Sequence, residues 1–233
     1  MKTSVKLLLG GAVVLLVLTG AMITRLGVYF FYQQSDYVHF TRYDDALIRR
    51  VPPLAKFNAV EVEGFWKVKL TKGASHQVVI KAPREVQERM TTRVEDGVLR
   101  LNQNVFSLGS SHHPELEITL PSLRRLKIRG GNEVAFAGFQ DAQTVLDVRG
   151  LNDVKGRACH MDQLRLSGVG GIGVDLSACH IKNAELDLSG LGEIKLNMAG
   201  GELKGKVGTE ISVEHTGTLK RKSLTVVSSA GTR

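Results

Sequence analysis

The sequence predicts an all-β protein, a parallel β-helix or β-solenoid with coils of about 20 residues, preceded by one N-terminal transmembrane helix. Three observations support this fold class. A short phrase ending in glycine repeats through the second half of the chain, short runs of alternating apolar and polar residues precede it, and an uncharged apolar run lies near the N-terminus. The composition, 42% hydrophobic with 2 Cys and 5 Pro, excludes a disordered chain or a disulfide scaffold.

The N-terminal segment, residues 1–24, is interpreted as a signal anchor. Lys2 and Lys6 precede the apolar run 7–24, which Arg25 ends. This run is at the lower limit of the roughly 20 residues that span a bilayer core. The positive-inside rule then predicts a single pass through the cell inner membrane, with the C-terminal part facing the periplasm or the exterior. The alternative is a cleaved signal peptide, because small residues at 19–21 suit a signal peptidase.

Residues 25–55 are expected to form a linker or stalk, and residues 56–233 the β-solenoid head domain. The linker has mixed polarity and contains Pro52-Pro53. Beyond it, alternating pairs such as Val60 and Val62 indicate short strands, and Asp96-Gly97 indicates a turn between two of them. Only residues 83–92 have a helical pattern.

The repeated phrase predicts the stacking of the coils. Its four copies and one degenerate copy are Leu126–Gly130, Leu146–Gly150, Leu164–Gly168, Leu186–Gly190 and Leu203–Ile211. Within a strand, apolar residues at alternate positions face inward, and the glycine allows a special turn. The outward positions then form a column of alternating charge, which would favour one register between neighbouring strands: Lys127, Asp147, Arg165, Asp187, Lys204.

Three segments carry a resemblance to a known family. They are Phe57–Gly64, the strand Asp96–Leu101, and Leu116–Leu123, which leads into the glycine-rich repeats. Together they resemble the putative auto-transporter adhesin, head GIN domain family. The resemblance implies a right-handed β-solenoid in the bacterial envelope, with an adhesin-like role and no established catalytic residues.

One candidate ligand-binding surface follows the repeated glycines. Amide and acidic side chains recur there in one register: Asn132, Glu133, Asn152, Asp153, Glu193. Such oxygens suit calcium, but the glycine and aspartate spacing of calcium-binding repeats is absent, which favours a solvated column of turns and no metal. The same acids could serve a polysaccharide lyase or glycosidase. Because no His, Lys or Tyr stands at a matching position, we expect no catalytic residue and no cofactor.

A second candidate surface is basic. Arg124, Arg125, Arg129 and Arg149 cluster around the first repeats of a chain whose net charge is +8, and Arg129 is expected beside Arg149. A solvated basic face is the favoured interpretation. The alternative is an anion between the stacked like charges, supplied by an acidic envelope polymer, lipid head groups or an acidic protein partner. Nucleic acid is not expected, since no aromatic residues interleave with the basic ones.

The two cysteines, Cys159 and Cys179, repeat within the tripeptide Ala-Cys-His. Phe139 stands at the equivalent position one coil earlier, which indicates inward, apolar positions. Buried thiols are favoured. A disulfide between stacked coils stays open because neighbouring strands lie within the range that a disulfide bridges. Zinc is disfavoured, since adjacent Cys and His residues of a strand face opposite sides.

The function predicted from these features is a membrane-anchored, envelope-facing binding or structural module, adhesin-like and without catalytic activity. The alternative is a polysaccharide-acting enzyme, a lyase or glycosidase, on a β-helix scaffold. Paired acids in a groove would favour that enzyme.

Overall fold

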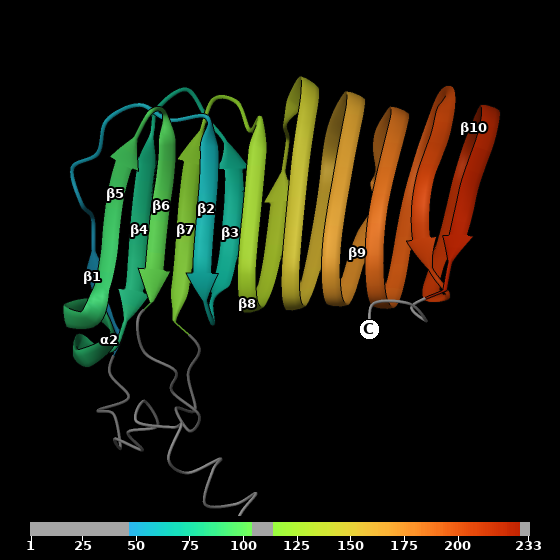
Figure 1. Cartoon of the computed structure of the whole chain (residues 1–233). Helices are drawn as coiled ribbons and strands as arrows, with labels where there is room; N and C mark the ends of the chain where they lie inside the picture. The colour runs from blue at the N-terminus through green and yellow to red at the C-terminus, as the bar shows by residue number, and fades with distance from the viewer. Residues whose placement is uncertain (1–46, 104–113, 229–233) are drawn as a thin grey trace, which may run out of the picture. The chain divides into compact units, whose positions relative to one another are not determined.

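The computed structural model describes residues 47–103 and 114–228, which belong to one compact unit, residues 42–233. They form one sheet with a single short helix (Figure 1). The elements are β1 (Ile48–Arg50), β2 (Ala59–Gly64), β3 (Lys67–Lys72), β4 (Gln77–Ala82), α2 (Arg84–Arg89), β5 (Met90–Glu95), β6 (Val98–Gln103), β7 (Glu115–Leu120), β8 (Arg125–Ala137), β9 (Gln140–Gly208) and β10 (Glu210–Val227).

The N-terminal part of the sheet is assembled from short strands out of sequence order. β8 is paired in parallel along its first part with β2 and along its second part with β3. β2 and β3 pair in parallel with β6 and β7 on their other sides. Antiparallel pairs close this end, because β4 joins β1 to β7 and β5 joins β6. The predicted helix over 83–92 is shorter than expected, and β5 begins at Met90.

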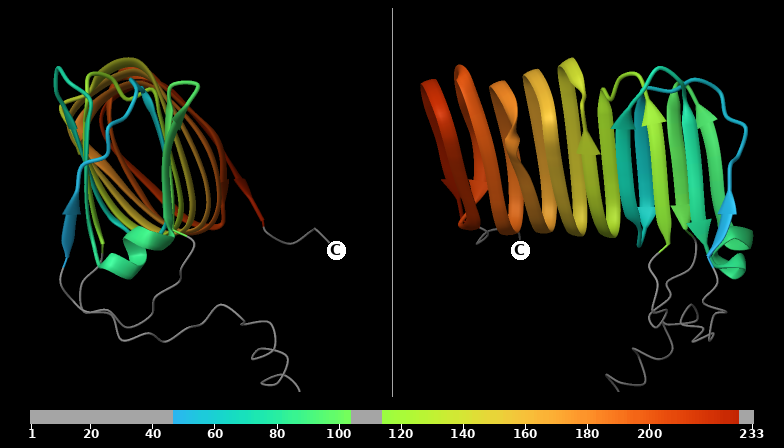
Figure 2. Two further views of the ribbon diagram at one scale, coloured as in Figure 1. Left: turned by 90° about the vertical axis from the view of Figure 1, so that its left-hand side faces the viewer. Right: turned by 180° about the vertical axis from the view of Figure 1, so that it is seen from behind.

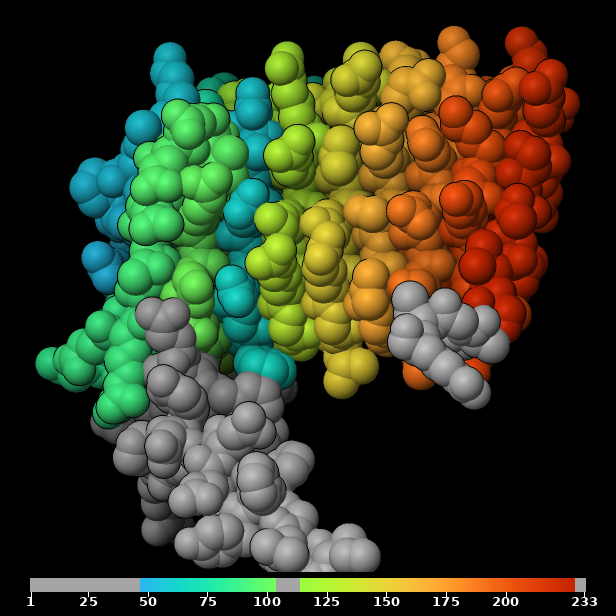
Figure 3. Space-filling model, viewed as in Figure 1, coloured from blue at the N-terminus to red at the C-terminus, as the bar shows by residue number. Residues whose placement is uncertain are grey.

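The C-terminal part is repetitive. β8 lies parallel to the start of β9 in continuous register, from Arg125↔Val145 to Ala137↔Arg157. β10 in turn lies parallel to the end of β9, with Val213 opposite Ile194. We call each stretch of about 20 residues that lies beside its equivalent in the next repeat a pass. The space-filling view shows the passes packed side by side from β8 to β10 (Figure 3).

The fold class predicted from the sequence is wrong. The protein is all-β, but its strands form one curled sheet, a half-barrel, rather than a parallel β-helix (Figure 2). β9 continues as one strand for 69 residues, so the repeated glycines bend the strand without ending it. The antiparallel pairs at β1, β4 and β5 also depart from the all-parallel prediction.

The glycines at the bends show which register the passes adopt. Gly130, Gly150, Gly170 and Gly190 have φ between 103° and 117°. A Cβ on Gly150 would collide with the carbonyl oxygen of Gly130, and the later glycines stand in the same relation. The prediction of a special turn at Gly150 and Gly190 is therefore confirmed. In the third pass the bend is at Gly170, not at the predicted Gly168.

This shift of two residues corrects the predicted charge column. Lys127 lies opposite Asp147, as predicted. Arg165, however, contacts Glu185, with 3.4 Å between its Nη2 and the carboxylate Oε2, and Lys204 contacts the same carboxylate at 3.9 Å. The third copy of the phrase starts like the others, so its sequence alone did not reveal that two more residues precede the bend.

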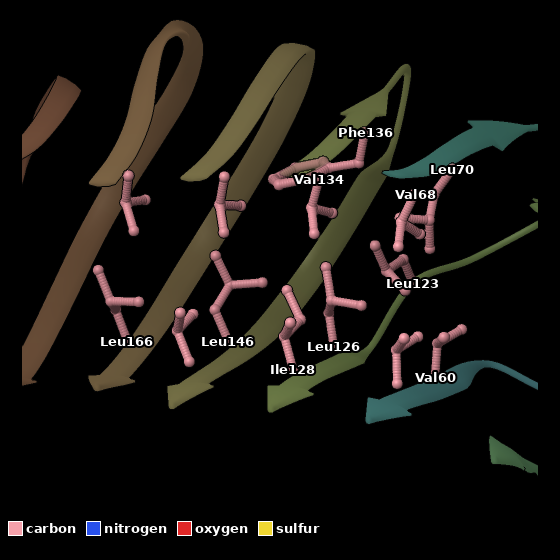
Figure 4. Packing of buried hydrophobic residues seen from close by; sticks show 14 of the residues in the cluster. Val60, Val68, Leu70, Leu123, Leu126, Ile128, Val134, Phe136, Leu146 and Leu166 are labelled. Atoms are coloured by element: carbon pink, nitrogen blue, oxygen red, sulfur yellow. The ribbon is translucent and has the colours of Figure 1, made fainter. Parts of the chain in front are cut away.

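Leucine, valine and isoleucine side chains on the inner face of the curl form the core. Leu126, Leu146 and Leu166 lie in one row from pass to pass (Figure 4). The core continues into the N-terminal strands through fully buried residues such as Val60 and Leu70. Burial of this apolar surface, at about 25 cal/mol per Å², is the main favourable contribution to folding.

The described residues contain no helix that is long and apolar enough to cross a membrane. The predicted signal anchor, residues 1–24, lies outside them, as does most of the predicted linker, 25–55. Within the linker range, Ile48–Arg50 form β1.

Candidate functional site

A groove of about 510 Å³ runs across four passes on the surface of the sheet. Each pass contributes equivalent positions, so the groove follows the stacking direction, with the passes about 4.8 Å apart. Its lining residues are Gln143, Thr144, Val145, Gln163, Leu164, Arg165, Asn183, Ala184, Glu185, Glu202 and Lys204.

Buried residues form the floor of the groove and polar residues its walls. Leu164 and Ala184 are each 2% exposed, and Thr144 takes the same row one pass earlier. The Thr144 hydroxyl is buried and has no hydrogen-bond partner among the described residues. Asp141, two residues before Gln143, lies at the N-terminal approach to the groove. Its carboxylate accepts hydrogen bonds from the Ser122 hydroxyl at 2.5 Å and from the Leu123 amide at 2.9 Å.

The amide side chains form the first wall. Gln143 and Gln163 are exposed, while Asn183 is half-buried and bonded to the neighbouring passes. Its Nδ2 donates to the Asp162 carbonyl at 3.2 Å, and its Oδ1 accepts from the Glu202 amide at 3.0 Å. Amide groups both donate and accept hydrogen bonds, so the two free-standing glutamines can bind hydroxyl or carboxylate groups of a ligand.

Charged side chains complete the lining: Arg165, Glu185 and Lys204 form the second wall, and Glu202 follows Asn183 on the first. Glu185 lies between two cations, Arg165 and Lys204, and Glu202 lies 3.8 Å from Nε of Arg221 on β10. Both carboxylates of the groove are therefore paired with cations. A ligand that enters the groove meets charge-paired carboxylates and partly free cations.

Of the predicted basic residues, two adjoin the groove. Arg125 pairs with Val145 of the groove wall, and the Arg124 carbonyl accepts a hydrogen bond from the Val145 amide at 2.9 Å. With Arg165 and Lys204, these arginines give the groove and its N-terminal approach four cations against three carboxylates, Asp141, Glu185 and Glu202. The sum of charges there is positive.

The other two predicted arginines lie elsewhere. Arg129 is opposite Arg149, as the sequence predicts. Arg129 lines a separate, smaller groove of about 270 Å³, together with Lys127 and Glu61. Arg149 is paired with Asp147 at 3.0 Å. The structure thus divides the basic cluster between two surfaces.

The predicted asparagine residues are not part of a solvated column. Asn132 is 4% exposed and Asn152 is 6% exposed. Asn132 Oδ1 accepts the Trp66 amide at 3.0 Å, and Asn152 Oδ1 accepts both the amide of Asn132, at 3.1 Å, and its Nδ2, at 2.9 Å. Each side chain also donates to the carbonyl three residues earlier. These two residues stabilise the bends internally and are not available to a ligand.

The predicted acids do lie on the surface, next to these asparagines. Glu133 is opposite Asp153. Asp153 is paired with Lys155 at 2.8 Å, and Glu193 is paired with Lys195 at 3.0 Å. Among residues 47–103 and 114–228, no group of three His, Cys, Asp or Glu side chains is arranged to hold a metal ion.

Cys159 and Cys179 are buried, 1% and 0% exposed, and are not joined to each other in the structure. The amide of the next residue, His160, donates to the Phe139 carbonyl at 2.9 Å, so Phe139 and Cys159 lie on neighbouring passes as predicted. A hydrogen bond with Cys159, together with burial, raises the pKa of Cys179.

The glutamines of the groove, Gln143 and Gln163, are not among the residues that the repeated phrase predicts as a binding surface. Their signal is a polar residue at the start of each pass, as in Gln143-Thr-Val and Gln163-Leu-Arg. The repeated phrase runs from its first leucine to its glycine, and this polar position lies before it.

The fold and the site together define a class of protein, a curled, parallel-stranded β domain with a polar groove along its stacked passes. The sequence of residues 56–232 matches the model of the family described as putative auto-transporter adhesin, head GIN domain. This match covers well over half of the chain, and the protein therefore belongs to that family. No curated protein matches the sequence.

Solved structures of similar fold include three from Bacteroides and Parabacteroides species. A putative adhesin from Bacteroides fragilis is similar, with a TM-score of 0.60 and 18% sequence identity, over 78% of this chain and 94% of that one. A putative lipid binding protein from Parabacteroides distasonis has a TM-score of 0.51 and 13% identity, over 80% and 98% of the two chains. A putative adhesin from Parabacteroides merdae has the same score and identity, over 80% and 97%. At these identities the similarity establishes the fold alone.

Proposed function

We propose that this protein is a non-catalytic, adhesin-like binding module of the cell envelope, and that its groove binds an extended, acidic, hydroxyl-rich polymer such as an acidic polysaccharide. The observation that carries the proposal is the groove itself, in which each of four passes presents equivalent residues. A site that repeats along one direction suits a ligand that also repeats.

The charges and hydrogen-bonding groups of the groove support an acidic ligand. The four cations at the groove and its approach outnumber the three carboxylates, and both carboxylates of the groove lining, Glu185 and Glu202, already contact cations. The exposed amides of Gln143 and Gln163 would bind hydroxyl groups. Family membership supports the adhesin-like role.

A polysaccharide-acting enzyme is the second candidate, because the groove contains two carboxylates, Glu185 and Glu202. Glycosidases place two such groups on either side of the bond that they cleave. Here Glu185 contacts Arg165 and Lys204, and Glu202 contacts Arg221, so both carboxylates are paired with cations, which favours binding over cleavage. Absence of cleavage products after long incubation with a bound polysaccharide would support the module, whereas their release would support the enzyme.

The location proposed for the module is the inner membrane, with the head domain facing the periplasm or the exterior. The support is the uncharged run at 7–24 after two lysines. The full-length chain should stay with membranes during a carbonate wash. Release by that wash, or a mature N-terminus near residue 22, would favour the cleaved signal peptide.

Binding can be tested on the full-length chain in detergent with three polymer probes. Polygalacturonate carries both acids and hydroxyls, dextran carries only hydroxyls, and polyglutamate carries only acids. We expect polygalacturonate to bind best and its affinity to fall with added salt. The variant Arg165→Ala/Lys204→Ala should bind at least tenfold more weakly, since two charge-assisted contacts are lost. Lys155→Ala, outside the groove, is the matched control. Equal binding of polygalacturonate by the unchanged protein and by both variants would refute the proposal that the groove is the binding site.

A further inference from the structure

The two ends of the curled sheet differ in how they are covered. At the N-terminal end, α2 lies across the edge with Val86 buried at 3% exposure, and β1 and β5 close the sheet (Figure 1). At the other end, β10 pairs with β9 alone among the described strands. Proteins built from stacked repeats need a polar unit at each end to cover the last repeat.

The last pass is incompletely buried. Val213, Leu219 and Leu224 pack against the core but are only partly buried, whereas Val226 is 66% exposed and Val227 is 46% exposed. Equivalent positions of the preceding pass are fully buried: Ile194, opposite Val213, is 0% exposed and Val207, opposite Val226, is 3% exposed. β10 therefore ends the core without covering it, and one side of its backbone has no strand beside it among the described residues.

The two arms of β10 carry opposite charges. The first arm, 210–216, contains Glu210 and Glu214 and no Lys or Arg, and the second arm, 218–227, contains Lys220, Arg221 and Lys222 and no Asp or Glu. All five side chains are exposed. The strand bends between the arms, where Gly217 has a φ of 80°.

We propose that β10 is a self-association surface, on which a second copy of this chain docks its own β10 in antiparallel orientation. A two-fold axis near Gly217 places the acidic arm of each copy beside the basic arm of its partner. Such an isologous contact is self-complementary, continues the sheet from one chain into the next and covers both exposed ends of the core. The dimer is independent of the proposed ligand of the groove.

Edge strands are also protected against pairing by lysines and by irregular register. β10 has both on its second arm, where the register with β9 shifts between Thr218 and Arg221. Protection requires charge of one sign only, and it gives no role to the two glutamates on the regular first arm. Opposite charges on the two arms are what a two-fold contact requires.

The test is a charge-swap experiment on the full-length chain in detergent, with the mass of the protein component measured by sedimentation. One variant, Glu210→Lys/Glu214→Lys, makes both arms basic, and the other, Lys220→Glu/Lys222→Glu, makes both arms acidic. We expect the unchanged chain to be a dimer and each variant alone to dissociate at least tenfold more readily. An equal mixture of the two should restore a dimer, which contains one chain of each kind.

The matched control is Arg93→Glu/Glu95→Lys, which reverses two exposed charges on β5 at the other end of the sheet and should leave the dimer unchanged. Circular dichroism checks that every variant is folded. A monomeric unchanged chain would overturn the proposal. So would a dimer that persists in both single variants, since association would then lie outside β10, or a mixture that stays monomeric.

Discussion

The two parts of the sheet share one core but are assembled in different ways. In residues 59–120 the strands are six residues long, and β2 lies between β6 and β8, which come far later in the chain. In residues 125–227 each pass lies beside the pass that precedes it in sequence. The first part therefore depends on contacts between distant segments, and the second on contacts between successive repeats.

This difference has a consequence for stability. A repetitive part is stabilised by nearest-neighbour contacts, so a defect in one pass acts mainly on the passes beside it. A part with distant pairings must close long loops before its contacts form, which slows folding. The following predictions test this contrast, from the largest expected effect to the smallest.

The largest effect is expected from Gly150→Ala. Its φ of 103° strains any side chain, and the new Cβ would collide with the carbonyl oxygen of Gly130 on the preceding pass. We expect a loss of about 4 kcal/mol or more in the free energy of unfolding, the range of severe backbone defects. Denaturant unfolding of the full-length chain measures it.

Gly97→Ala is the matched control in the non-repetitive part. Gly97 also has a positive φ, 72°, but a Cβ there would meet no atom within 4 Å. Only the conformational cost of about 1 to 2 kcal/mol should appear. Equal losses in the two variants would show that the contact between passes contributes nothing.

A smaller effect is expected from Asn152→Ala, which weakens the junction of the two parts. Asn152 holds Asn132, and Asn132 in turn accepts the Trp66 amide of the N-terminal part. Removal leaves the amide of Asn132 and one N–H of its Nδ2 without an acceptor, at about 2 to 3 kcal/mol, while the other N–H keeps the Arg129 carbonyl. Asn102→Ala, on β6, serves as the comparison and should change the unfolding free energy far less. If the two variants lost the same free energy of unfolding, the junction would not depend on the hydrogen bonds that join Asn152, Asn132 and Trp66.

The cysteine pair tests whether water is excluded from the core of the repetitive part. Cys159→Ser should cost about 1 kcal/mol, because burial of the hydroxyl is only partly offset by the Arg157 carbonyl, which accepts a hydrogen bond from the Cys159 thiol at 3.2 Å. In the native chain, both thiols should react with iodoacetamide much more slowly than in denaturant, given their burial. Rapid native alkylation would place them on the surface. A mass deficit of two protons in protein isolated from the envelope would instead reveal a disulfide.

The smallest effect concerns an ion pair in the N-terminal part, Lys81 with Glu117 at 2.7 Å. A hydrogen bond from Lys81 lowers the pKa of Glu117 below its usual 4.5. The pair therefore stabilises the folded state above pH 4.5, and this contribution is lost as the pH falls through the lowered pKa. Both side chains are more than 30% exposed, so the contribution is small.

Glu117→Gln should accordingly lower the unfolding midpoint slightly at pH 7 and have no effect at a pH well below 4. Thermal unfolding across this range measures the difference between the two chains. A difference that persisted in strong acid would have a cause other than the charge of Glu117.

The sequence by itself determined the local features of the repetitive part. Alternation along Leu126 and Ile128 identified the inward face, Gly150 and Gly190 marked bends, and the pairing of Lys127 with Asp147 set one register correctly. Each depends on the period of two along a strand or on the backbone freedom of glycine, which are properties of the local sequence.

Only the tertiary structure decided the rest. Two glycines, Gly168 and Gly170, stand near the third bend, and the collision of a Cβ with the preceding pass selects the second. Asn132 and Asn152 are polar in sequence, yet are buried because the Trp66 amide needs an acceptor. Whether repeated strands close into a helix or remain a curled sheet depends on how the bends add up over many passes, and on the antiparallel strands at one end. The total bend over many passes depends on contacts between distant segments. The groove, formed by equivalent residues of four passes, depends on them too, and no local sequence pattern encodes such contacts.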